Sequence, residues 1–192
     1  MCRLTATTVF GTTAQAERAG RRVRAMHARL SAIDPATGER FRVDEPDLLH
    51  RICELAVDLG GYGLAWIGFA EHDPRKTVRV AVKEGRGRDY VTDRFVTWAN
   101  EPRGQGPTGT AIRTGRPVTC SDLLTDPSFL PWRDRAVEFG FGSSLVLPLR
   151  RDNEADAPGP SKDDPHQAPG RSVFGALSIY AAEKNAFHRE EI

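Results

Sequence analysis

The pattern of apolar and polar positions switches between a helical and a strand-like period along the chain. Apolar residues recur every three or four positions over residues 14–33 and again over 48–59, which predicts two amphipathic helices. The second is expected to begin at Asp44, a good N-cap, and to end at Gly60-Gly61. Short apolar runs predict strands at 64–71, 78–83, 118–120, 145–150 and 173–181, and further helices are expected at 88–98, 107–115 and 132–137.

The first predicted helix has the a and d spacing of a coiled coil, with apolar residues at Ala16, Ala19, Val23, Met26, Leu30 and Ile33. Two interpretations stay open: a helix that rests its apolar stripe on the domain, or a helix that forms a homodimer. Its arginines lie elsewhere on the helix and suit phosphate contacts, but the rest of the chain adds nothing to a nucleic-acid role. We therefore divide the chain into an N-terminal segment, 1–43, and a domain, 44–192.

Residues 152–171 interrupt the domain between two strands that are expected to pair. This segment is rich in Pro, Asp and Gly and has no apolar residue larger than Ala, so burial cannot offset the entropy lost on ordering it. We expect an inserted, disordered hairpin loop, with a lid over a site as the alternative. The chain ends at Ile192, where residues 187–191 open a further expected helix, which suggests a truncated final helix.

Residues 106–126 form the most informative segment. Pro107 suits the first position of a helix, and Gly115 suits the left-handed conformation that often ends one. Pro117, which follows Arg116, prevents the helix from continuing. A short β-prone run follows, and then the turn formers Ser121 and Asp122. Helix, tight stop, short strand and acidic turn together resemble the central signature of GAF domains, the sensory modules of signalling proteins.

The resemblance extends over residues 44–192, through the apolar runs at 64–69, 143–149 and 174–180. It implies an α+β fold of the GAF/PAS-like kind: a central antiparallel sheet of about five to six strands, with helices on both faces and an N-terminal helix. It also implies a regulatory domain that senses a small molecule in a bacterial signal-transduction protein. The output domain would be a diguanylate cyclase, a phosphodiesterase or a histidine kinase, none of which is in this chain.

The resemblance places the ligand cavity at the start of the helix that Pro107 opens. Pro107, Thr108 and Thr110 are candidate binding residues by position, and free backbone N–H groups there suit a carboxylate or phosphate. Leu124 occupies a position that often faces the cavity. Asp122 corresponds to a family acidic residue, and capping the following turn is its alternative role.

Three larger side chains complete the candidate site. Trp132 and Arg133 would form its outer wall, with an indole for stacking and a guanidinium for an anion, although Trp132 could instead be core. Trp66 shares a strand face with Leu64 and Gly68, and the matching family position points into the cavity. Either the ligand is small and flat, or no ligand binds and the indole is core. The second case describes a ligand-free dimerisation or interaction module.

One GAF family is catalytic: the free methionine-(R)-sulfoxide reductases, which act through cysteine thiolates in the same cavity. The reactive cysteine of their motif corresponds to Thr108 here, and a hydroxyl without an activating base is a far poorer nucleophile than a thiolate. We therefore expect no catalysis, and we keep a reductase-like enzyme as the less favoured alternative.

The composition of the chain limits its possible partners, its location and its cofactors. The charges nearly cancel, with 27 basic and 26 acidic residues, so no overall field favours nucleic acid or a membrane. No apolar run reaches the length of a membrane span. The three cysteines are odd in number and widely spaced, which argues against a disulfide framework and for a cytoplasmic location. The five histidines are scattered, so we expect no metal site, and the cofactor stays unknown.

Overall fold

The computed structural model describes residues 46–92, 96–152 and 171–187. Several predictions lie outside these residues: the N-terminal helix at 14–33, the N-cap at Asp44, the interior of the insert at 152–171, and the final helix. Within the described part, no helix is long and apolar enough to cross a membrane.

The centre of the molecule is a five-stranded antiparallel sheet in the order β2-β1-β5-β4-β3. Its strands are β1 (Leu64–Ala70), β2 (Val78–Glu84), β3 (Val118–Cys120), β4 (Ser143–Asp152) and β5 (Arg171–Ala181). All five predicted strands are therefore present, and the two that flank the insert pair with each other as expected. The main difference in bounds is β4, which begins two residues earlier than the apolar run because Ser143 and Ser144 are buried within it.

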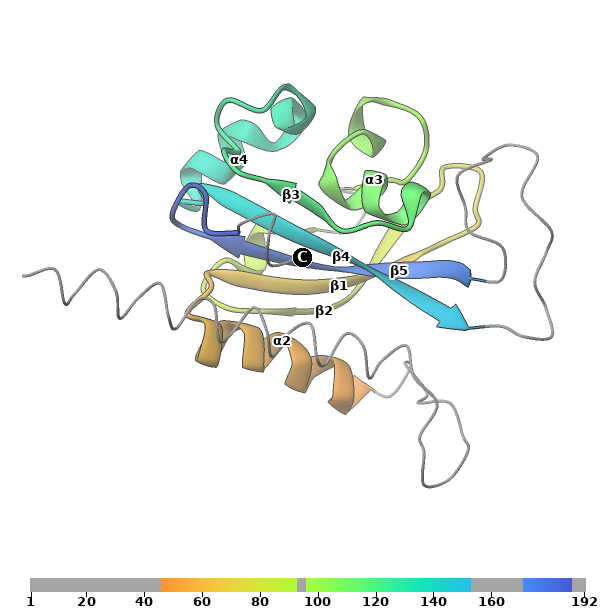
Figure 1. Cartoon of the computed structure of the whole chain (residues 1–192), viewed down its shortest axis with the longest axis horizontal. Coiled ribbons are helices and arrows are strands. Elements are labelled where there is room, and N and C mark those ends of the chain that lie inside the picture. The colour runs from red at the N-terminus through yellow and green to blue at the C-terminus, as the bar shows by residue number, and fades with distance from the viewer. Residues whose placement is uncertain (1–45, 93–95, 153–170, 188–192) are drawn as a thin grey trace, which may run out of the picture.

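Helices cover both faces of the sheet, which confirms the expected α+β architecture (Figure 1). The helix α2 (Pro46–Gly60) lies on one face, and α3 (Pro107–Thr114) and α4 (Arg133–Glu138) lie on the other. A 3₁₀ segment, Pro127–Trp132, leads directly into α4. We call the two sides of the sheet the α2 face and the α3 face.

Each face of the sheet holds its own core, because successive side chains of a strand point to opposite sides. The core on the α2 face includes Leu49, Ile52, Ala56, Ile67, Leu147, Leu177 and Ile179. The core on the α3 face is richer in aromatic rings and includes Leu64, Trp66, Tyr90, Phe129, Trp132, Phe141 and Tyr180. Trp66 and Leu64 share the α3 face, as the strand parity predicted.

The prediction of a helix over residues 88–98 is wrong. Among the described residues of this segment, only Arg88–Tyr90 is helical, as a single 3₁₀ turn; Val91 is then extended, and Thr97 makes an isolated antiparallel bridge to Thr77. The β-branched residues of this segment favour extended backbone, and burying the Tyr90 ring in the core of the α3 face decides its path.

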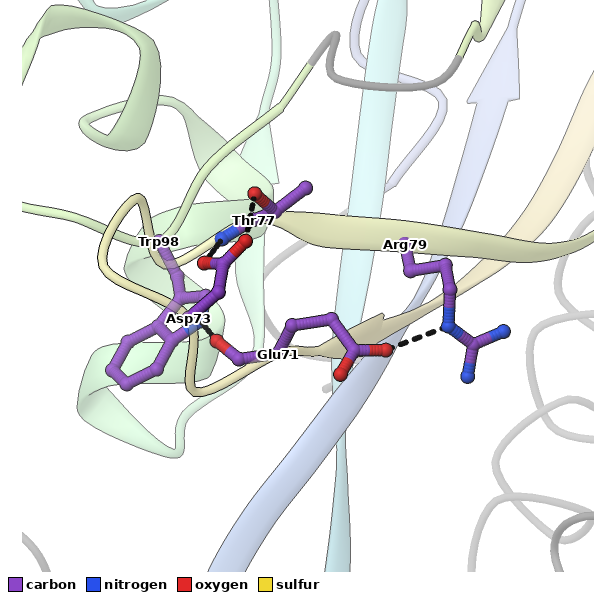
Figure 2. A network of polar contacts seen from close by, with 5 residues as sticks. All are labelled: Glu71, Asp73, Thr77, Arg79 and Trp98. Atoms are coloured by element: carbon purple, nitrogen blue, oxygen red, sulfur yellow. Dashed lines mark hydrogen bonds and ion pairs between the residues drawn. The ribbon is translucent and has the colours of Figure 1, made fainter.

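A network of polar contacts fixes the turn between β1 and β2 and ties the next loop to it (Figure 2). Both carboxylate oxygens of Asp73 accept hydrogen bonds from Thr77, from its backbone N at 2.9 Å and from Oγ1 at 2.7 Å. Trp98 Nε1 donates to the backbone O of Glu71 at 2.9 Å, and Arg79 pairs with the Glu71 carboxylate at 2.6 Å. The loop that leads to α3 is therefore anchored on the edge of the sheet.

Arg113 fastens the other end of this loop to α3. Its Nη1 donates to three backbone oxygens: those of Trp98 and Ala99, each at 3.1 Å, and that of Gly104 at 2.5 Å. The guanidinium of Arg113 is half-buried and positively charged, so these charge-assisted hydrogen bonds are stronger than bonds between neutral groups. The start of α3 is thus held in a fixed place above the sheet.

Candidate functional site

The helix α3 has both of the end signals that its sequence predicted. Gly106 is the extended N-cap residue, Pro107 occupies the first turn, and Gly115 leaves the helix at φ 61° with its N–H bonded to the Ala111 oxygen. Gly106, as a glycine, supplies no side-chain cap to the first turn of α3. The N–H groups of that turn therefore present the positive end of the helix dipole toward whatever lies in front of Gly106 and Pro107.

In front of this helix start lies a small cavity between α3, the 127–132 segment and the α3 face of the sheet. Its wall consists of Trp66, Val91, Val96, Gly106, Pro107, Thr108, Phe129, Trp132 and Tyr180. The volume is about 10 Å³, which is room for about one water molecule. The aromatic side chains therefore fill most of the space between the helix and the sheet.

The wall contains buried polar atoms. Thr108 Oγ1 and Ser178 Oγ share a hydrogen bond at 3.1 Å, which joins the helix start to the centre of β5. Trp66 Nε1 is buried without a hydrogen-bond partner of ordinary geometry, although it lies near enough to the Tyr180 hydroxyl to affect its pKa. Outside the wall, Ser144 Oγ, opposite Tyr180 on the neighbouring strand, is also buried without a partner among the described residues. An unsatisfied buried polar group costs about 1–3 kcal/mol.

A cluster of tyrosine and phenylalanine rings forms the back of the cavity. The Tyr180 ring centroid lies 5.4 Å from that of Tyr90 and 5.2 Å from that of Phe141. Burial is the main cause that raises the pKa of Tyr90 and of Tyr180 well above the usual value for a tyrosine. Both hydroxyls therefore stay protonated at neutral pH and keep a hydrogen to donate.

Four of the eight residues predicted for the site come together in this wall: Trp66, Pro107, Thr108 and Trp132. The other five wall residues were not predicted: Val91, Val96, Gly106, Phe129 and Tyr180. Strand parity could have found Tyr180, because it stands two positions from Ser178 and so shares its face of β5.

The other four predicted residues lie outside the wall of the cavity. The Thr110 hydroxyl donates to the Gln105 oxygen at 3.1 Å, since two positions along a helix turn it away from Thr108. Asp122 accepts from Leu124 N at 3.0 Å and from Lys184 Nζ at 2.8 Å, which matches its alternative role as a cap. These hydrogen bonds hold the pKa of Asp122 below the usual range, that from Lys184 contributing most.

Arg133 and Leu124 are half-buried outside the cavity. Arg133 Nη2 donates to the Asp126 backbone oxygen at 3.2 Å, while its Nε is buried without a partner. The guanidinium thus contacts the turn before the 127–132 segment and does not line the cavity.

Cys120 belongs to the same core, at the end of β3. Its thiol donates to Asp126 Oδ2 at 3.3 Å. Burial and the neighbouring carboxylate raise its pKa to about 12, and burial raises the pKa of Cys53 on the α2 face to about 12 as well. Both sulfurs are therefore neutral thiols at physiological pH.

The fold and the sequence together define the class of this chain. The sequence model of the GAF domain family matches residues 43–155, which is more than half of the chain. The protein belongs to the GAF domain family. A second family, the catalytic domain of ER-bound oxygenases and rubber oxygenases, matches residues 2–58; the described part of that match is the helix α2, which packs beneath the GAF sheet.

Solved structures of GAF domains share this fold at low sequence identity. The GAF region of a membrane protein from Geobacter sulfurreducens aligns with a TM-score of 0.53 and 17% identity, over 77% of this chain and 83% of that one. The GAF domain of A. aeolicus nlh2 aligns with a TM-score of 0.51 and 14% identity, over 92% and 85%.

An enzyme of the family is also similar. The free methionine-R-sulfoxide reductase from Neisseria meningitidis, solved with its substrate, aligns with a TM-score of 0.56 and 14% identity, over 93% of this chain and 80% of that one. Identities in this range show the fold alone. A search of curated proteins gave no match.

Proposed function

We propose that this chain is a non-catalytic, regulatory GAF domain that senses a small molecule in the cavity in front of α3. One observation carries the proposal: the wall of the cavity keeps Trp66 Nε1 buried without a hydrogen-bond partner of ordinary geometry among the described residues, beside a helix start whose N-cap residue, Gly106, has no side chain to cap it. Burying an N–H group without a hydrogen-bond partner lowers the stability of a protein, because the group loses its contacts with water. A core that served packing alone would be more stable with apolar side chains of similar shape at these positions. A bound ligand would satisfy them.

The ligand would enter by displacing the 127–132 segment from the helix start. Trp132 and Phe129 are the two wall residues on this short segment, whereas Trp66 and Tyr180 stand on central strands of the sheet. A ligand that binds better when the segment is displaced shifts the population toward that state. We further propose that this movement is passed to a homodimer and an output domain; the segments expected to mediate it lie outside the described residues.

Catalysis of the reductase kind finds no support in this wall. The Thr108 hydroxyl, which corresponds by resemblance to the reactive cysteine, is hydrogen-bonded to Ser178, and the described residues of the cavity wall include no His, Asp, Glu or Lys to act as its base. The Cys120 thiol is held neutral beside Asp126. Sulfoxide reduction needs a thiolate as nucleophile, so we propose a regulatory role and not a catalytic one. The number and spacing of the cysteines favour a cytoplasmic location.

Thermal unfolding of the full chain with a low-molecular-mass extract of bacterial cells tests this function. A ligand at about 100 times its Kd stabilises the folded state by about 2.7 kcal/mol, which raises the melting temperature of a chain of this size by several degrees. The Trp98→Phe variant, which loses an indole N–H outside the cavity, should respond like the wild type, and Trp66→Phe should respond less. An equal response of Trp66→Phe, or no response of any form, would contradict the proposal.

The small volume of the cavity, about 10 Å³, favours a second candidate: an interaction module whose two cavity tryptophans are simply core. Truncating the buried Trp132 to Ala would then cost about 3–5 kcal/mol, as for other large core residues. The sensor makes a different prediction for the same variant. In the sensor, the wild type is stabilised by a component of the extract and Trp132→Ala changes that response; in the interaction module, neither form responds.

A further inference from the structure

We propose that the ligand of this cavity is a small planar molecule that presents a carbonyl or carboxylate oxygen to Trp66 Nε1 and the start of α3, and whose ring takes the place of the Trp132 indole. This inference rests on the proposed function, because it names the chemistry of the ligand at the same site.

The polar groups of the wall select an acceptor. Trp66 Nε1 can only donate, and the first-turn N–H groups of α3 can only donate. The hydroxyls of Thr108 and Tyr180 can also donate. None of the described wall residues carries a charged side chain, so a cation would meet a positive helix end with no carboxylate among them to balance it. A ligand oxygen with lone pairs matches this wall.

The rings of the wall select a flat molecule. Four of its nine residues are aromatic: Trp66, Phe129, Trp132 and Tyr180. The Trp132 ring lies against Gly106, where the absence of a Cβ lets a planar group reach the helix start. The same approach is open to another ring once the indole has left. Stacked and edge-on aromatic pairs contribute about 0.5–1.5 kcal/mol beyond their buried area.

The size of the ligand is set by the wall residue that can be displaced to make room for it. A cavity of about 10 Å³ admits no organic molecule, so a wall residue must make room. Trp132 adjoins Leu130, which is 63% exposed, and the exposed Pro131, so two residues of this segment stand at the surface among the described residues. Displacing the Trp132 side chain would therefore leave a space of about one indole, which sets the size of the ligand.

Three probes of nearly the same shape test this chemistry: benzamide, benzoate and benzylamine, which is a cation at neutral pH. They would be added at millimolar concentrations to the ¹⁵N-labelled full chain, whose three tryptophans give three indole N–H signals in an NMR spectrum. Single Trp→Phe variants assign these signals. Trp98, whose indole donates to Glu71 outside the cavity, is the internal control.

We expect benzamide, benzoate or both to move the Trp66 signal to lower field, as a new acceptor does, and to move the Trp132 signal. The Trp98 signal should stay in place, and benzylamine should change none of the three. The tighter binder of the first two distinguishes a carbonyl from a carboxylate ligand. Trp66→Phe should bind that probe about tenfold more weakly, because one hydrogen bond is lost.

Three results would overturn the inference: benzylamine that moves the Trp66 signal as the other probes do, a Trp132 signal that moves without Trp66, or no change with any probe. Its failure can be told from a failure of the proposed function. If the cell extract stabilises the wild type while the probes leave Trp66 unchanged, the sensor function stands and only the ligand class is wrong.

Discussion

The Trp132 indole packs directly on Gly106, the N-cap residue of α3. A Cβ placed on Gly106 would lie 2.6 Å from Trp132 Cη2, which is closer than two such atoms approach in proteins. The glycine therefore sets how near the ring comes to the start of the helix. Since the ring also closes the cavity, this contact links the backbone of α3 to the state of the site.

Substituting Gly106→Ala should push the Trp132 ring away and destabilise the protein by about 1–3 kcal/mol, the usual cost of overpacking a core. The backbone of Gly106 is extended at φ −67° and ψ 174°, so alanine fits it without strain. Urea unfolding measures the loss. In a Trp132→Ala background the cost should fall to a few tenths of a kcal/mol, and equal costs in the two backgrounds would show that the ring does not press on this residue.

Two adjacent buried serines on β4 offer a matched comparison. Ser143 Oγ donates to the Glu183 oxygen at 2.6 Å and accepts from Ala186 N at 3.3 Å, whereas Ser144 Oγ has no partner. Ser143→Ala should therefore destabilise by about 1–2 kcal/mol, and Ser144→Ala should be neutral or stabilising by up to about 1 kcal/mol. Equal losses on chemical unfolding would mean that Ser144 finds a partner on the cavity side.

The sequence predicted the elements of the fold better than their arrangement. The five strands follow from local apolar runs, but β1 lies next to β5, a pairing between residues more than a hundred positions apart that no local pattern encodes. The segment at 88–98 was predicted as a helix from apolar spacing alone. Burial of Tyr90 and the bridge between Thr97 and Thr77 determine its real path, and both depend on tertiary contacts.

In the candidate site, too, local patterns predicted some residues correctly, whereas others depend on tertiary contacts. Strand parity placed Trp66 on the correct face, and the helix end signals placed Pro107 and Thr108 at the start of α3. Residues chosen by position along the chain, such as Thr110 and Asp122, satisfy nearby backbone groups instead. Strand parity alone puts Tyr180 on the same face of β5 as Ser178, but only the sheet order shows that this face lines the cavity.

Arg113 should prove important for the loop in front of the cavity. Arg113→Ala leaves the carbonyls of Trp98, Ala99 and Gly104 without their shared donor, and we expect a loss of about 2–3 kcal/mol. Arg116→Ala, at an exposed position just beyond α3, should cost less than about 0.5 kcal/mol. Hydrogen exchange at the Trp98 indole should accelerate in the first variant only; unchanged exchange there would contradict the anchoring role.

The buried thiols predict a loss of stability at alkaline pH. The pKa of both Cys53 and Cys120 is raised from 9.0 to about 12 in the folded chain, so the unfolded chain releases these protons first as pH rises. The free energy of unfolding should therefore be unaffected by them below about pH 9 and should fall between about pH 9 and 12. Replacing both cysteines with alanine should flatten that fall.

Thiol reactivity checks the same property at neutral pH. In a Cys2→Ser background, native protein should react with a disulfide reagent at pH 8 far more slowly than protein in urea, because neutral buried thiols are poor nucleophiles. Reaction of Cys120 at the rate of a free thiol would revive the reductase-like alternative.

Native mass spectrometry of the freshly purified full chain, compared with its mass after denaturation, tests the central claim most directly. The account predicts an additional mass per chain, no larger than that of a small planar molecule, that disappears on denaturation and is depleted in Trp66→Phe but not in Trp98→Phe. A chain that carries only its own mass, both alone and after incubation with the cell extract, would contradict a sensory role and leave the interaction module as the better account.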